Sequence, residues 1–352
     1  MGRRHYVDAA CVRSSKMGGM TLLRRGGKVT ARLRRRTGAL LVDNFFRGIS
    51  RAGKLHPHAN PQRHDVVVQR DIAYLDTGLP EHHLDVYLPG PLARGEVESA
   101  PVVLYVHGGG FRILSKDTHW VMGLAFARRG YVVFNVGYRL APRYPFPAAV
   151  TDVCAALDYV GKNARRFGAD MDRLVFAGES AGGNLVTSLA VATSYRRKEI
   201  WARSIYDAGH RARAVVAACA LLQVSDIQRF KRRWPHMSGF IGDRLGEVSD
   251  SYLGDPMQHD ETLRDLADPL LVFERGDTPD RPLPAFFAPC GTKDPLIDDS
   301  RRLQAALTQM GVPCEAKFYP GEVHAFHALV FRPNARRCWA DTYAFLDKHV
   351  PR

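Results

Sequence analysis

Gly178-Glu179-Ser180-Ala181-Gly182-Gly183 is the stretch that decides the fold. It follows the apolar run Arg173-Leu-Val-Phe-Ala177 and opens a helix-forming run from Asn184 to Ala192, so it predicts a strand, a tight turn and a helix, with a serine at the apex. Small residues two before and two after the serine let the chain turn sharply and hold the hydroxyl clear of the backbone. A lone GxSxG is weak evidence, but here the required context is present. We therefore interpret Ser180 as a nucleophile.

A glycine run follows the upstream strand, which we expect over Pro101–Val106. In His107-Gly108-Gly109-Gly110-Phe111, no side chain shields the backbone N–H groups of the glycines. We predict that Gly108 and Gly109, with Ala181, hold the negative oxygen that forms when a hydroxyl attacks a carbonyl. A phosphate-cradling loop is the alternative, but the segment lacks the GxxxxGK[ST] spacing of a P-loop.

A nucleophilic serine needs a base, and the base needs an orienting acid. Asp294 follows the apolar run Ala285–Cys290, and His324 follows the strand-like run Glu315–Tyr319. Doubly wound sheets place reactive groups just past their strands, and the chain order serine, aspartate, histidine is known for serines on such turns. Asp294 and His324 are therefore the predicted acid and base.

Three residues compete for these two roles. Asp298 and Asp299 are rival acids, but they fall where a helix begins, and we expect them to cap it. His327 is a rival base that lies three residues beyond His324, and we expect it to pack on the following helix or to face solvent.

Taken together, the segments resemble one known family, the hormone-sensitive-lipase-like carboxylesterases of the α/β-hydrolase superfamily. Further matches, in family order over about residues 65 to 349, are Tyr138-Arg-Leu-Ala-Pro142, Tyr144–Ala149, Asp294-Pro-Leu296, Gly311-Val-Pro313 and Pro320-Gly-Glu-Val-His324. The resemblance implies an α/β-hydrolase fold, a triad of Ser180, Asp294 and His324, and the oxyanion donors predicted above. We also assign substrate binding to Phe111 and Glu179, the residues next to Gly110 and Ser180.

Three positions depart from the family pattern. Gly137 and Arg143 stand where the family usually has acids, and Ala325 stands where it usually has glycine after the catalytic histidine. None of these changes removes a reacting group, but they prevent any transfer of substrate range from relatives.

The composition fits one large domain. A chain of 352 residues with 45% hydrophobic content can bury the core of an α/β domain with an added lid. No CxxC pair occurs, and we expect reduced core thiols of an intracellular protein. The histidines show no HExxH spacing, and we expect neither a metal nor a cofactor. The six cysteines are Cys11, Cys154, Cys219, Cys290, Cys314 and Cys338.

The net charge of +14 is concentrated in one part of the chain. Residues 1–70 hold 16 Lys/Arg and 3 Asp/Glu, a balance of +13, which leaves 34 against 33, or +1, for the rest. Residues 71–352 are nearly neutral, which argues against nucleic acid as a partner. Nucleic-acid binding would also leave the motifs described above unexplained.

Basic residues alternate with leucines and valines over 22–42. Three interpretations stay open: a helix that packs on the lid, which we favour, a helix for an anionic membrane surface, and a partly disordered tail. The sequence shows no secretory signal and no run of transmembrane length, so we expect a cytoplasmic protein and leave peripheral membrane contact open. Met17 and Met20 are alternative starts to Met1.

Hydrophobic patterning predicts an edge hairpin and then strand–helix alternation. The hairpin comprises 65–74 and 84–88 and is antiparallel. Continuous apolar strands alternating with helices predict a mostly parallel sheet covered on both faces. The expected strands are 102–106, 132–136, 174–177, 214–222, 283–290 and 315–319, and the expected helices are 119–129, 147–167, 184–192, 243–253, 300–310 and 334–349.

The alternation stops over 225–283, and long insertions between sheet strands tend to be functional lids. We therefore predict a basic arm at 1–63 that contributes to a helical cap, a catalytic domain over 64–224 and 284–352, and a cap insertion over 225–283.

The predicted reaction is hydrolysis of a small-molecule carboxylic ester through an acyl-enzyme intermediate. Two alternatives remain: an amide or formamide hydrolase on the same triad, and a catalytically silent ligand-binding relative. The sequence leaves open the natural substrate, the acyl chain length and the oligomeric state, a homodimer included.

Overall fold

The computed structural model describes residues 43, 44, 48, 50–254 and 261–351. Residues 43–352 form one compact unit. Most of the predicted basic arm, and positions 255–260 of the predicted cap, lie outside the described residues.

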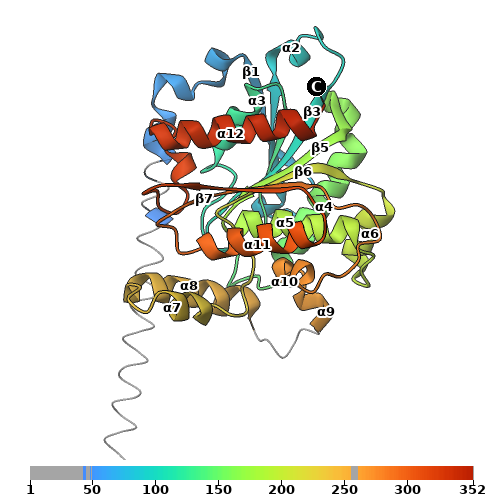
Figure 1. The fold of residues 1–352 in the computed structure, drawn as a ribbon. Helices are drawn as coiled ribbons and strands as arrows, with labels where there is room; N and C mark the ends of the chain where they lie inside the picture. Colours follow the sequence, from blue (N-terminus) through green and yellow to red (C-terminus); the bar gives the residue numbers. More distant parts are fainter. Residues whose placement is uncertain (1–42, 45–47, 49, 255–260, 352) are drawn as a thin grey trace, which may run out of the picture. The chain divides into compact units, whose positions relative to one another are not determined.

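An eight-stranded sheet in the order β1-β2-β4-β3-β5-β6-β7-β8 runs through the unit (Figure 1). β1 pairs antiparallel with β2, and β2 pairs antiparallel with β4, whereas all remaining neighbours are parallel. The predicted edge hairpin and mostly parallel sheet are confirmed. The strands are β1 (Val66–Ala73), β2 (His83–Pro89), β3 (Ala100–Val106), β4 (Val132–Val136), β5 (Ala169–Glu179), β6 (Ala212–Ala218), β7 (Ala285–Gly291) and β8 (Cys314–Tyr319).

Helices cover both faces of the sheet, as the continuous apolar strands require. α3 (Trp120–Ala127) and α12 (Pro333–His349) lie on one face, and α4 (Ala148–Asn163), α5 (Ala181–Ser194) and α11 (Ile297–Gln309) lie on the other (Figure 1). The alternation of side chains along each strand divides the core accordingly, with Val103 in the cluster under α3 and α12 and Leu104 in the larger cluster under α4 and α5.

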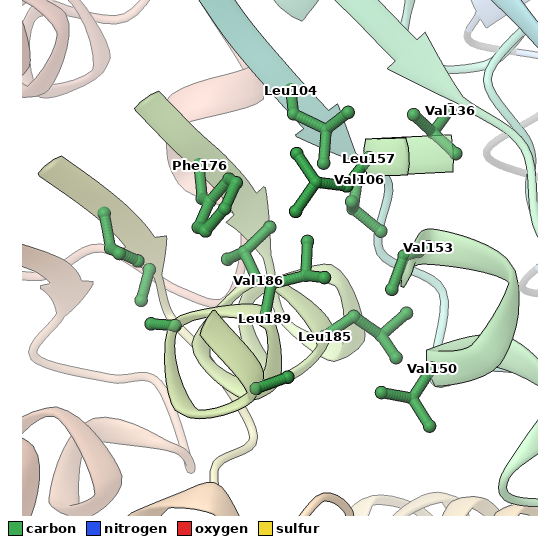
Figure 2. Packing of buried hydrophobic residues seen from close by; sticks show 14 of the residues in the cluster. Leu104, Val106, Val136, Val150, Val153, Leu157, Phe176, Leu185, Val186 and Leu189 are labelled. Carbon is green, nitrogen blue, oxygen red and sulfur yellow. The ribbon is translucent and has the colours of Figure 1, made fainter. Parts of the chain in front are cut away.

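The larger cluster holds the site's scaffold in place. Branched aliphatic side chains of α4 and α5 interdigitate with those of the central strands (Figure 2). All fourteen residues of α5 are buried, so the helix that begins at the predicted nucleophile is fixed along its whole length. The labelled side chains are Leu104, Val106, Val136, Val150, Val153, Leu157, Phe176, Leu185, Val186 and Leu189.

The remaining helices are short or lie between β6 and β7. α6 (Ile200–Asp207) was not predicted. α10 (Pro269–Glu274) packs against α11 and α5, although it falls within the predicted cap insertion 225–283. No helix among the described residues is long and apolar enough to cross a bilayer. The others are α2 (Gly90–Ala93), α7 (Gln228–Arg233), α8 (Gly239–Leu253) and α9 (Glu261–Arg264), with 3-10 turns η1 (Pro57–Ala59), η2 (Pro61–His64), η3 (Pro80–His82), η4 (Ala164–Phe167) and η6 (Phe326–Ala328).

The prediction of a strand over 214–222 is wrong in its second half. β6 ends at Ala218, and Cys219 turns the chain with a φ of 39°. The carboxylate of Asp299 accepts the backbone N–H of Leu222 at 2.8 Å. The loop residues are as apolar and as buried as a strand, which is why periodicity alone extended the strand.

β1, the edge strand next to β2, contains an irregularity. Its register with β2 shifts between Gln69 and Ile72, and Asp71 has a φ of 55°. The side chain of Arg70 contacts that of Asp85. The carboxylate of Asp71 lies 2.6 Å from the ammonium group of Lys116. These two charged residues therefore occupy the bulge of the strand.

Candidate active site

The turn between β5 and α5 places Ser180 at the carboxyl end of the sheet. Ser180 has φ 54° and ψ −116°, a strained conformation for a residue with a side chain. A Cβ at Gly178 would lie 2.5 Å from the carbonyl oxygen of Gly182, and one at Gly182 would lie 2.1 Å from that of Val106. Because those obstacles are backbone atoms, both glycines are required, and the sharp turn follows from the sequence.

The loop over residues 107–111, here the glycine loop, runs beside this turn. Gly109 has a φ of 111°, and a Cβ there would lie 2.1 Å from the carbonyl oxygen of Ile113. Ala181 is the first residue of α5, where backbone N–H groups have no partner within the helix. The predicted oxyanion donors thus lie on two adjoining backbone segments, since a Cβ at Gly108 would be 3.0 Å from the carbonyl oxygen of Glu179.

Three of the predicted side chains meet at the end of the sheet. His324 Nε2 lies 3.0 Å from Ser180 Oγ, and His324 Nδ1 lies 2.8 Å from Asp294 Oδ2. The other oxygen, Asp294 Oδ1, accepts the backbone N–H of Leu296 at 2.8 Å, which fixes the carboxylate plane. The Asp294 side chain is fully buried, whereas that of His324 is 37% exposed and open to a substrate.

The imidazole of His324 is electrostatically coupled to its acid. Burial acts to lower its pKa, but the Asp294 carboxylate outweighs burial and raises the pKa of His324 well above 6.5. In the neutral imidazole, which forms above that pKa, the hydrogen bond to Asp294 favours the tautomer with the proton on Nδ1, which leaves Nε2 as an acceptor facing Ser180.

Glu179, predicted to bind substrate, lies instead within the protein at 5% exposure. Its Oε1 lies 2.7 Å from His119 Nε2, and its Oε2 lies 2.8 Å from His327 Nε2. Burial would raise the pKa of Glu179, but the two histidines together hold it well below its usual value. The prediction for Glu179 is wrong in this structure, because both carboxylate oxygens are occupied by partners within the chain.

Phe111, also predicted to bind substrate, has no exposed surface. Its ring stacks on that of Tyr252 in α8, with centroids 3.6 Å apart. A Cβ at Gly110 would lie 2.6 Å from Val248 of the same helix, so α8 packs directly on the glycine loop. Phe111 therefore anchors the loop under α8 and presents no surface to a substrate, contrary to the prediction.

The rival residues have other partners. α11 begins at Ile297, earlier than predicted, so Asp298 and Asp299 occupy its first turn and do not cap it. Asp299 is buried against Arg229 at 2.6 Å, and Asp298 lies 2.9 Å from Arg233 on the surface. His327 packs near Trp339 of α12, as expected, and its pairing with Glu179 was not foreseen.

Two of the family departures have a local explanation or consequence. A Cβ at Gly137 would lie within 2.9 Å of the carbonyl oxygens of Glu81 and His83, so only glycine fits there. Ala325 has φ 57° and ψ 25°, the left-handed region that favours glycine. Arg143 lies with its guanidinium 5.2 Å from the ring centre of Tyr144.

Cys219, which the sequence analysis placed among the core thiols, also borders the site. The Sγ of Cys219, a carboxylate oxygen of Asp294 and a ring nitrogen of His324 lie within 4.8 Å of one another. Burial raises the pKa of the Cys219 thiol to about 12. No sequence signal marks this contact, because it depends on how β6 ends beside β7.

The comparisons with known proteins cover the whole site. A family model described as alpha/beta hydrolase fold matches residues 103–328, which include Ser180, Asp294 and His324. A bacterial heroin esterase is similar with TM-score 0.71 and 23% identity, over 88% of this chain and 91% of that one. A hyperthermophilic esterase from the archaeon Pyrobaculum calidifontis has TM-score 0.67 and 23% identity, over 91% and 97%. Esterase LipW from Mycobacterium marinum has TM-score 0.67 and 24% identity, over 88% and 90%.

Proposed function

Because the chain belongs to the alpha/beta hydrolase family, we propose that it hydrolyses carboxylic esters through an acyl-enzyme formed on Ser180. The observation that carries the proposal is the continuous chain of contacts from Ser180 Oγ through both nitrogens of His324 to Asp294, at 3.0 and 2.8 Å. The similar structures named as esterases support the same reaction class.

In the first half-reaction, Ser180 Oγ attacks the ester carbonyl while His324 Nε2 accepts its proton. Asp294 holds the imidazole in the required tautomer and stabilises the imidazolium that forms. The N–H groups of Gly108, Gly109 and Ala181 are the proposed donors to the oxyanion. His324 then protonates the departing alcohol.

In the second half-reaction, water replaces the alcohol. His324 Nε2 takes a proton from the water, the hydroxide attacks the acyl-enzyme carbonyl, and the same proton returns to Ser180 Oγ as the carboxylic acid leaves. The chain's own residues supply every proton transfer in this scheme.

The test is hydrolysis of a p-nitrophenyl ester series of increasing acyl length by the purified protein and by Ser180→Ala. Turnover should fall on the order of 10⁴-fold or more, because the three residues act as a unit. Ser188→Ala is the matched control, since it removes a hydroxyl from α5, the helix that follows Ser180, and should retain activity. Circular dichroism verifies that both variants fold.

Substantial activity in Ser180→Ala would overturn the assignment of the nucleophile. A p-nitroanilide with the same acyl group as the preferred ester distinguishes ester from amide specificity. Faster cleavage of the anilide would replace the proposed ester substrate with an amide and leave the triad assignment intact.

A further inference from the structure

A buried thiol lies against the acid–base pair of the site. Cys219 follows the last residue of β6 and is 1% exposed. Its backbone N–H donates to the carbonyl oxygen of Pro289 in β7 at 2.8 Å, which fixes the turn that directs the thiol toward Asp294 and His324. One donor atom from each of these three residues lies within 4.8 Å of the other two.

Sulfur, imidazole nitrogen and carboxylate oxygen form a donor set that selects for particular cations. Zinc and its heavier relative cadmium bind cysteine, histidine and aspartate together, whereas magnesium and calcium prefer oxygen donors alone. We propose that Cys219, Asp294 and His324 form an inhibitory binding site for a thiophilic divalent cation of the zinc and cadmium class.

The charge and surroundings of the site suit such an ion. The cation displaces the proton of the Cys219 thiol, which leaves to solvent. The resulting thiolate and the Asp294 carboxylate supply two negative charges, which neutralise a divalent cation in a buried position. Cys219 packs with Ile297 and Cys290, and Phe318 lies against the same cluster, so the walls are largely apolar. The 37% exposed edge of His324 gives the ion a path from solvent.

Metal binding requires the donor atoms to change their separations. Cys219 Sγ, which now lies within 4.8 Å of the other two donors, must lie about 3.5 Å from each around tetrahedral zinc. Asp294 Oδ1 is held by the N–H of Leu296, so Oδ2 is the oxygen available to a metal. The present separation of 2.8 Å between Asp294 Oδ2 and His324 Nδ1 would have to widen to about 3.3 Å for tetrahedral zinc with bonds of about 2 Å. The ion would take the place of the proton that these two atoms share.

Occupancy has a definite chemical consequence. A neutral imidazole has one protonated nitrogen and one acceptor nitrogen. With the metal on Nδ1, the proton must sit on Nε2, which then donates to Ser180 Oγ and cannot accept the serine proton. A bound cation therefore removes the general base.

The binding experiment uses Ser180→Ala, which keeps all three ligands but lacks the proposed nucleophile. Titration with Cd²⁺, followed by calorimetry and by the ultraviolet absorption of the cadmium–thiolate bond, should show one site per chain. Adding Cys219→Ser should remove the absorption and weaken binding at least about tenfold, since even indirect partners of a metal contribute about 10–100-fold. Cys314→Ser, which changes a half-buried thiol on β8, should bind as the parent does.

The inhibition experiment rests on the proposed function and is separate from the binding result. Zn²⁺ or Cd²⁺ should inhibit ester hydrolysis reversibly, with recovery on adding a chelator, and Mg²⁺ should not. For Cys219→Ser, rates are normalised to that variant's own rate without metal. The metal concentration that halves its rate should be at least about tenfold higher than for the unmodified protein. If the protein proves inactive on esters, the cadmium–thiolate signal still tests the site.

Two results would overturn the site. One is equal Cd²⁺ binding by the Ser180→Ala parent and its Cys219→Ser derivative, which would place the metal elsewhere. The other is a signal lost in Cys314→Ser instead, which would assign the metal to the thiol on β8.

Discussion

Both oxygens of Asp294 are in use, one on His324 Nδ1 and the other on the N–H of Leu296. Asp294→Asn should therefore keep the geometry but present an amide to the histidine, which favours the wrong tautomer. We expect turnover to fall by roughly 10⁴-fold. Asp298→Asn, which breaks a surface pair with Arg233, should leave turnover almost unchanged. Kinetics at equal folded concentration compare the two, and the reverse ranking would refute the assignment.

Ala325 has a backbone conformation that its side chain disfavours, with a φ of 57°. A non-glycine residue in this region destabilises the folded protein by about 1–2 kcal/mol. Glycine removes that strain, but its greater conformational freedom in the unfolded chain lowers stability by about 0.4–1 kcal/mol. Ala325→Gly should therefore stabilise the protein by about 0.5–1 kcal/mol in chemical denaturation. A decrease in stability would mean that the methyl group packs better than its backbone position suggests.

At the scale of elements, Glu179 joins the end of β5 to the loop that carries His324. His119 lies 60 residues before it, and His327 follows His324 by three. Glu179→Gln leaves one histidine facing an amide donor. Because it also removes the charge from a buried pair, it should lower the free energy of unfolding by about 3 kcal/mol or more. Glu315→Gln, which breaks an exposed pair with Lys348, is the matched control and should cost under about 1 kcal/mol.

The same variant has a predictable dependence on pH. Because the folded-state pKa of Glu179 lies well below its ordinary 4.5, its contribution is present above pH 4.5 and is lost as pH falls through the lower folded value. Urea denaturation of wild type and Glu179→Gln should show a stability gap near neutral pH that closes below 4.5. A gap independent of pH would mean that packing, not charge, makes the difference.

How far the sequence predicted these elements depended on whether the signal was local. The turn at Ser180, the glycines beside it and the strands before Asp294 and His324 all follow from residues adjacent in the chain. The partners of Glu179, the stack of Phe111 on Tyr252 and the contact of Cys219 with His324 join distant segments. No pattern in one sequence encodes such pairings, so Glu179 and Phe111 were assigned to substrate.

At the scale of the whole molecule, the described part of the chain begins to contact the site region before β1. Asp43 accepts the N–H of Leu114 at 3.4 Å, and Ser50 donates to the carbonyl oxygen of Thr118 at 3.3 Å. The segment they contact carries His119, the partner of Glu179. Residues 43–64 therefore support the site indirectly.

This arrangement predicts different results from two truncations. A chain beginning at Asp43 should keep the stability and ester turnover of the full chain, because residues 43–352 form one unit. A chain beginning at residue 64 should be less stable and less active, since the segment around His119 loses its cover. Thermal denaturation and p-nitrophenyl ester assays measure both effects. Equal behaviour of the two truncated chains would show that 43–63 is dispensable.

The same truncations test whether the basic arm contacts a membrane, because the chain from Asp43 lacks residues 1–42 of that arm. If the arm binds anionic lipid, the full chain should sediment with anionic vesicles at low salt, and the chain from Asp43 should not. High salt should release it, because each basic contact contributes about 1 kcal/mol and is screened. Failure of the full chain to sediment would remove membrane contact from consideration.

The bulge in β1 has a consequence for how copies of this chain can associate. A foreign strand that approaches the β1 edge would form regular hydrogen bonds only up to the shift between Gln69 and Ile72, where it would also meet Arg70 and Asp71. Bulges and charges of this kind protect sheet edges from runaway aggregation. A strand of a second molecule would meet no such interruption at the opposite edge of the sheet, along β8, whose register with β7 is regular.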